Sequence, residues 1–93
     1  MAHYLLANMN IGKTIAKIRK SNKLTQEETA AKLQLMGMRY THTRIGLIET
    51  GRLNVPLDML VALKLIFQCE FADFFVGLEE ELMENIRRAE DTL

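Results

Sequence analysis

This chain of 93 residues has a single cysteine, no long apolar run and no net charge, and each absence excludes something. Cys69 cannot form an internal disulfide, and its place in an apolar segment suits a small buried side chain in a reducing cytoplasm. No apolar run approaches the ~20 residues that span a bilayer. The N-terminus lacks the basic start and apolar core of a signal peptide. We therefore expect one globular domain in the cytoplasm.

Sequence patterns for catalysis and metal binding are absent as well. His3, His42 and Cys69 lie far apart in the chain, so no Cys/His group has the spacing of metal ligands. There is no nucleophile elbow and no phosphate-binding loop. The three carboxylates of residues 79–81 suit the first turn of a helix, where the helix dipole favours negative charge. We expect no catalytic residue, no metal and no cofactor.

The charges balance overall but are segregated along the chain. Residues 1–52 carry nine Lys and Arg against three Glu, which leaves +6. Residues 53–93 carry three Lys and Arg against nine Asp and Glu, which leaves −6. Such an asymmetry indicates one surface for a polyanion and an acidic part turned away from it. Accidental segregation on a solvated surface is the alternative.

Two short helices joined by a long turn are predicted in the middle of the chain. Thr25 and Glu28 form a capping box, in which each side chain accepts a hydrogen bond from the other residue's backbone N–H. A helix should therefore begin at Gln26 and run to about Gln34. Its buried side should consist of Ala30 and Leu33, with Thr29 at the margin.

The second of these helices should span residues 42–50. Thr41 can cap its start, and Gly51 is a natural stop just past its end. Ile45 and Ile48 give it only a narrow buried edge. The other side chains of so short a helix must point away from the core, as expected of a helix that contacts another molecule.

Apolar residues at helical spacing predict further helices on both sides of this pair. Asn10 can cap the first of them. Pro56 suits the first turn of a fourth helix, which should be largely buried along Leu57, Leu60, Val61, Leu63, Ile66 and Phe67. A short fifth helix should span residues 71–76. No strand or repeat is indicated, so the predicted fold class is all-α.

Residues 78–93 form a separate amphipathic helix by the same criterion. Its apolar positions recur at spacings of three and four and comprise Leu78, Leu82, Ile86, Ala89 and Leu93. This stripe either folds back on the core or packs against a second copy of the chain. We favour dimerisation. Residues 1–9 give only weak signals and are treated as an N-terminal tail.

The order of several residues resembles the Cro/repressor-type (Xre-like) helix-turn-helix regulators. That pattern has an Arg in its first helix, T-Q-x-x-x-A, a Ser or Thr opening the third helix, and I-x-x-I-E-x-G. The matching residues are Arg19, Thr25, Gln26, Ala30, Thr41, Ile45, Ile48, Glu49 and Gly51. The likeness covers roughly residues 11–77. The chain departs from the pattern in a longer turn, residues 35–40, which a subset of these regulators shares.

The resemblance implies a lambda-repressor-like five-helix DNA-binding bundle over residues 10–77, with an added C-terminal helix. It places helix 42–50 in a major groove, where the base-reading residues would be His42, Thr43, Arg44 and Leu47. Leu47 cannot form hydrogen bonds with its side chain, so it would contact thymine methyls or pack on a neighbouring helix. Gly46 permits close approach, either of a base edge or of the first motif helix.

The resemblance also implies the roles of residues around this helix. Candidate phosphate-binding residues are Gln26, Thr41, Thr50, Arg52 and Asn54. Arg19 and Glu49 are expected to form a partly buried structural salt bridge. The expected function is a duplex-DNA-binding transcriptional regulator, with repression as the expected effect, that acts as a homodimer. The alternative is an antitoxin-like protein-interaction module, whose acidic C-terminal half binds a protein partner.

Overall fold

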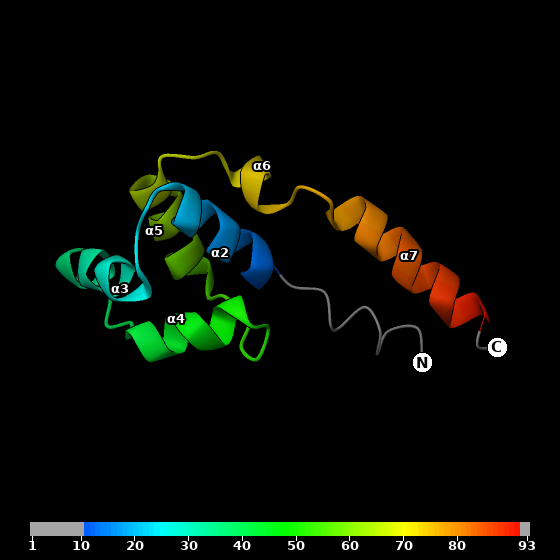
Figure 1. The fold of residues 1–93 in the computed structure, drawn as a ribbon, viewed down its shortest axis with the longest axis horizontal. Helices are drawn as coiled ribbons and strands as arrows, with labels where there is room; N and C mark the ends of the chain where they lie inside the picture. The colour runs from blue at the N-terminus through cyan, green and yellow to red at the C-terminus, as the bar shows by residue number, and fades with distance from the viewer. Residues whose placement is uncertain (1–10, 92–93) are drawn as a thin grey trace.

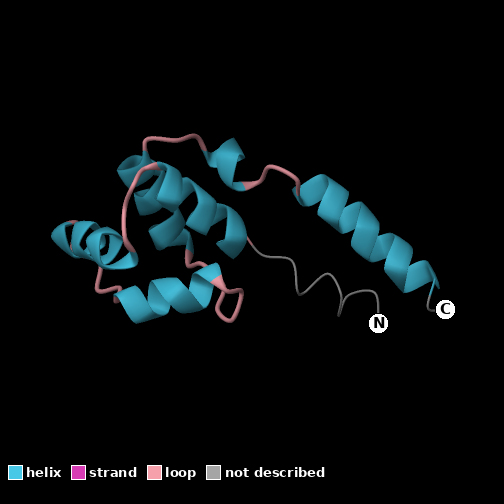
Figure 2. Cartoon of the chain, viewed as in Figure 1, coloured by secondary structure: helices cyan, strands magenta, loops and turns pink. Residues whose placement is uncertain are grey.

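The computed structural model describes residues 11–91, and within them every regular element is a helix (Figure 1, Figure 2). The elements are α2 (Gly12–Ser21), α3 (Gln26–Leu35), α4 (His42–Glu49), α5 (Leu57–Phe67), α6 (Phe71–Phe74) and α7 (Leu78–Asp91). The predicted all-α class is therefore confirmed. The predicted tail, the predicted cap Asn10 and the last stripe residue, Leu93, lie outside the described residues. The first described helix begins at Gly12 with Ile11 as its N-cap.

The hydrophobic core lies between α2, α3, α4 and α5, and α7 runs outward from this group (Figure 1). Its most deeply buried side chains include Ile15, Leu33, Met59 and Leu63, each at most 2% exposed. Phe74, from the one-turn α6, is also completely buried. Full burial of one such side chain contributes roughly 1.5–3 kcal/mol, so this cluster explains why short helices are stable here.

Hydrogen bonds at Thr25 determine where α3 begins. Thr25 Oγ1 accepts from the Glu28 N–H at 3.0 Å, and Glu28 Oε1 accepts from the Thr25 N–H at 2.9 Å. These bonds confirm the predicted capping box, and they lower the pKa of the Glu28 carboxyl from its usual value. The helix ends at Leu35, one residue later than predicted. Thr29 is fully buried rather than marginal, and its hydroxyl donates to the Thr25 carbonyl at 2.9 Å, so the buried proton has an acceptor.

Glycines in the left-handed region end both motif helices. Gly37 has φ +84° after α3, and Gly51 has φ +81° after α4. At Gly51 the backbone N–H donates to the Ile48 carbonyl, and the next N–H, from Arg52, donates to the Leu47 carbonyl. This pair of bonds is a Schellman motif, which requires a residue that tolerates positive φ. The predicted stop at Gly51 is confirmed, with α4 ending at Glu49 and Thr50 as its C-cap.

The prediction that α5 is largely buried along its apolar stripe is wrong for one side of the helix. Leu57 is 75% exposed and Val61 is 42% exposed, and Leu65 continues the same exposed line. The buried residues are Met59, Leu60, Ala62, Leu63 and Phe67. Apolar residues occur all round this helix, so periodicity alone does not show which face meets the core.

The helix predicted over residues 71–76 is also shorter than expected. It ends at Phe74 with Phe75 as its C-cap, and Val76 is 71% exposed. Gly77 follows with φ +84°, and α7 begins at Leu78. The chain therefore leaves the bundle through a short, exposed connection before α7.

Candidate nucleic-acid interface

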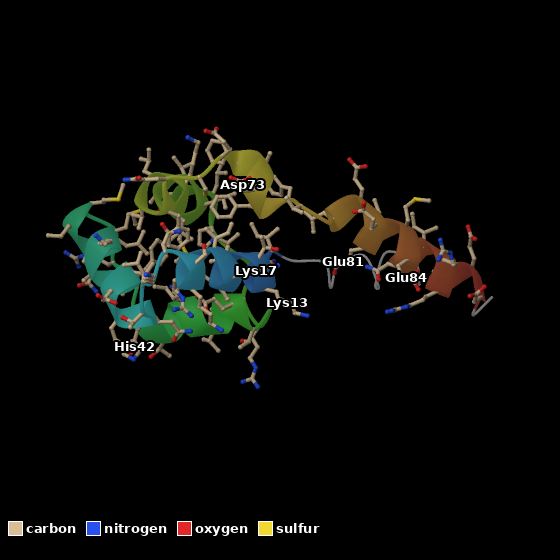
Figure 3. All side chains as sticks on the ribbon, turned by 45° about the horizontal axis from the view of Figure 1, so that its top comes forward. Lys13, Lys17, His42, Asp73, Glu81 and Glu84 are labelled. Atoms are coloured by element: carbon tan, nitrogen blue, oxygen red, sulfur yellow. The ribbon has the colours of Figure 1, made fainter. Side chains whose placement is uncertain are left out.

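The first turn of α4 presents its polar side chains to solvent. The Thr41 hydroxyl accepts from the Arg44 N–H at 3.2 Å, as expected of an N-cap. Ile45 and Ile48 lie on the inner edge, 3% and 2% exposed. The outer residues His42, Thr43 and Arg44 are exposed, and Leu47 is half-buried. Figure 3 shows His42 at the outer edge of the molecule.

An ion pair joins α2 to the end of α4. Arg19 Nε lies 2.6 Å from Glu49 Oε2, and Arg19 Nη2 donates to Glu49 Oε1 at 3.0 Å. The third donor, Nη1, bonds the Leu24 carbonyl at 2.7 Å. The hydrogen bond with Glu49 raises the pKa of Arg19 above its usual value. This bidentate geometry restricts the orientation of α4 relative to α2, because two parallel hydrogen bonds between planar groups allow less rotation than one.

Gln26 also bonds Glu49, an interaction that the sequence did not reveal. Its side-chain Nε2 donates to Glu49 Oε1 at 3.0 Å. One amide donor of the predicted phosphate-binding residue is therefore directed toward a carboxylate. The structure also shows what approaches Gly46: a Cβ there would lie 3.4 Å from Gln26 Oε1. Gly46 thus lies against the start of α3. The sequence suggests close approach of either a base edge or this first motif helix, and the structure shows the helix.

The other predicted phosphate-binding residues lie at the two ends of α4. Thr41 precedes its first turn, and Thr50, Arg52 and Asn54 follow its last turn. All four are exposed. The Thr50 hydroxyl donates to the Gly46 carbonyl at 3.0 Å, so its oxygen keeps acceptor capacity while its proton is engaged.

Tyr40 is a residue of this surface that the sequence analysis missed. It belongs to the lengthened turn before α4, and its ring lies under the Arg44 guanidinium, whose central carbon is 5.6 Å from the ring centroid. The Tyr40 hydroxyl donates to Asp58 Oδ1 at 2.7 Å, and this bond raises the pKa of Tyr40. The spacing of Tyr40 and Arg44 was visible in the sequence, but the partner on α5 depends on the tertiary fold.

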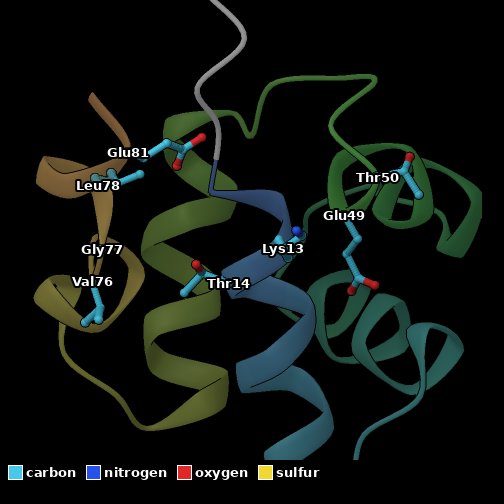
Figure 4. A pocket seen from close by; sticks show the side chains of 8 residues that line it. All are labelled: Lys13, Thr14, Glu49, Thr50, Val76, Gly77, Leu78 and Glu81. Carbon is cyan, nitrogen blue, oxygen red and sulfur yellow. The ribbon is translucent and has the colours of Figure 1, made fainter. Parts of the chain in front are cut away.

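A cleft of about 320 Å³ lies where α2, the end of α4 and the start of α7 approach one another (Figure 4). Lys13, Glu49 and Glu81 are its charged lining residues. Of these, Glu49 is already engaged by Arg19 and Gln26. Among residues 11–91, no group of three or more His, Cys, Asp or Glu side chains could hold a metal ion. No helix in the same range is long and apolar enough to cross a membrane.

The predicted dimerisation stripe on α7 is only partly available as a surface. Leu78 and Leu82 are half-buried, and Ile86 is 36% exposed. Ala89 is 7% exposed in the single chain, so it has little surface left to bury against a second copy. Met83, which is not one of the predicted stripe residues, is 59% exposed and adds apolar area on the same helix.

Comparisons of the chain with models of known protein families, with curated proteins and with solved structures found no match. The functional inference therefore depends on the geometry of α4 and its surroundings.

Proposed function

We propose that this chain is a lambda-repressor-like helix-turn-helix protein that binds duplex DNA with α4 in the major groove. One observation carries the proposal: α4 is short, buried along a single edge, and exposes three consecutive hydrogen-bonding residues in its first turn. They are His42, Thr43 and Arg44. Side chains on the first turn of such a helix are the ones that reach base edges in this mode of binding.

The charge distribution supports a nucleic acid as the partner. The half of the chain that contains α2, α3 and α4 carries the net positive charge, which would attract phosphates and release their counterions. Thr41 lies at the start of α4, and Thr50, Arg52 and Asn54 lie after its end, where the DNA backbone would flank a helix in the groove. We propose that the protein acts in the cytoplasm as a repressor, by occupying an operator.

We propose that a homodimer is the binding species, with α7 as the contact between copies. Exposed Met83 and Ile86 lie on this outward helix, and paired half-sites suit a twofold dimer. The second candidate, an antitoxin-like protein-interaction module, is favoured by the acidic residues on the same helix. In that case α7 would bind a basic partner protein instead of a second copy.

Selection from random duplex DNA at about 100 mM salt tests the proposal, because electrostatic binding alone is weakened there. Wild type should enrich a motif with twofold symmetry. A Thr43→Ala/Arg44→Ala variant should bind that motif at least about tenfold more weakly, since one good base contact contributes roughly 1–3 kcal/mol.

Lys17→Ala is the control, because it removes an exposed positive charge from α2 and changes neither α4 nor the proposed contact on α7. It should keep the enriched motif. If wild type enriches no sequence, the DNA-reading function is wrong. A selected motif without twofold symmetry would argue against the dimer alone.

A further inference from the structure

The lengthened turn between α3 and α4 places one aromatic ring where it contacts two helices. Tyr40 is half-buried and packs against the hydrophobic core. Its hydroxyl is fixed by Asp58 in the first turn of α5, at 2.7 Å. Asp58 is itself held, because the same carboxylate oxygen accepts from the Met59 N–H at 2.8 Å. The ring therefore has a defined position before any ligand binds.

The exposed face of this ring is covered by Arg44. The guanidinium carbon lies 5.6 Å from the ring centroid, within the ~6 Å at which a cation is attracted to an aromatic face. The backbone of Arg44 is restrained too, because its N–H donates to the Thr41 hydroxyl. Arg44 is thus an exposed arginine whose backbone and side chain are both oriented by the residues just before α4.

We infer that Tyr40 is a positioning residue for DNA reading, which acts by holding the Arg44 guanidinium in place beside the first turn of α4. This inference rests on the proposed function. A long arginine side chain loses conformational freedom when it binds, and a stacked guanidinium has lost part of that freedom beforehand. The lengthened turn would then serve specificity, in addition to joining two helices.

A double-mutant cycle on the selected duplex separates this role from simple packing. Its members are wild type, Tyr40→Leu, Arg44→Ala and the double variant, compared by fluorescence anisotropy at one salt concentration. Tyr40→Leu should weaken binding about two- to fivefold, the range expected for an exposed cation–π contact. The same substitution should have no further effect once Arg44 is absent. Tyr40→Phe keeps the aromatic face and should restore most of the affinity.

Each alternative outcome identifies a different failure. An equal loss from Tyr40→Leu with and without Arg44 would show that Tyr40 acts through the fold, and would overturn the inference. Unchanged binding by Tyr40→Leu would overturn it as well. If Tyr40→Leu does not fold, as judged by circular dichroism, Tyr40→Met replaces it in the cycle as a second side chain without an aromatic face, and additivity of its effect with that of Arg44→Ala overturns the inference. If wild type selects no DNA sequence at all, the proposed function fails first and this inference fails with it.

Discussion

Two ion pairs in this molecule have the same chemistry and different surroundings. Arg19 and Glu49, which join α2 to α4, have side chains 9% and 6% exposed. Arg87 and Glu84, one turn apart on α7, have side chains 65% and 46% exposed. The first guanidinium has three separate acceptor contacts from two residues, whereas the second pair is a single contact at 2.9 Å.

The difference shows which part of the molecule depends on its charges. Ions removed from water need all their partners, because an unpaired buried charge is strongly unfavourable. Ions on an exposed helix remain hydrated whether or not they touch. The charges around Glu49 therefore determine how α2 and α4 are oriented, whereas the exposed ion pair on α7 contributes little to the fold.

Loss of the buried carboxylate should have the largest effect. In Glu49→Ala, Arg19 keeps only its bond to the Leu24 carbonyl, and the Gln26 amide loses its acceptor. We expect the free energy of unfolding to fall by about 3 kcal/mol, near the lower end for a broken buried pair. Urea unfolding followed by circular dichroism measures this loss.

Glu49→Gln is the control for shape, since it retains the size of the side chain and an oxygen that can accept hydrogen bonds. Its loss should be smaller than that of Glu49→Ala. A loss below about 1 kcal/mol in Glu49→Ala would contradict the comparison, because the pair would then behave like an exposed one.

An intermediate effect is expected at the capping box of α3. Thr25→Ala removes the acceptor of the Glu28 N–H and should lower the free energy of unfolding by about 1 kcal/mol at neutral pH, whereas Thr25→Ser should have little effect.

The pKa of Glu28 is lowered in the folded chain. The stabilisation from this carboxylate is therefore present above its unfolded pKa and lost as pH falls through its folded pKa. Wild type and Glu28→Gln should therefore differ less in their free energy of unfolding at pH 3 than at pH 7, because Gln carries no charge to lose, and a difference that does not change with pH would refute this.

Local rules predicted the ends of the motif helices because their hydrogen bonds join neighbouring residues. Thr25 and Thr41 cap helices within three positions of themselves, and Gly51 ends one by its own conformation. The buried face of α5 was not predictable in this way. Leu57 and Leu60 are equally apolar, and only the packing of the other helices decides that Leu60 is covered and Leu57 is not.

The same distinction between local contacts and contacts that depend on the whole fold applies to the candidate site. The outward residues of α4 follow from its two buried isoleucines, and the Arg19–Glu49 pair was implied by the resemblance. The bonds from Gln26 to Glu49 and from Tyr40 to Asp58 join residues 23 and 18 positions apart, on elements whose contact depends on the whole bundle. No spacing in the sequence identifies such partners.

The smallest effect is expected at the exposed pair on α7. Glu84→Ala removes the contacts to Arg87 and Arg88, yet we expect the free energy of unfolding to change by less than about 0.5 kcal/mol, since all three side chains are hydrated. Urea unfolding at two protein concentrations, tenfold apart, measures this. A loss above about 1 kcal/mol that appears only at the higher concentration would mean that a second copy covers this part of α7. The exposed pair would then belong to an interface, and its contrast with Arg19–Glu49 would hold for the single chain alone.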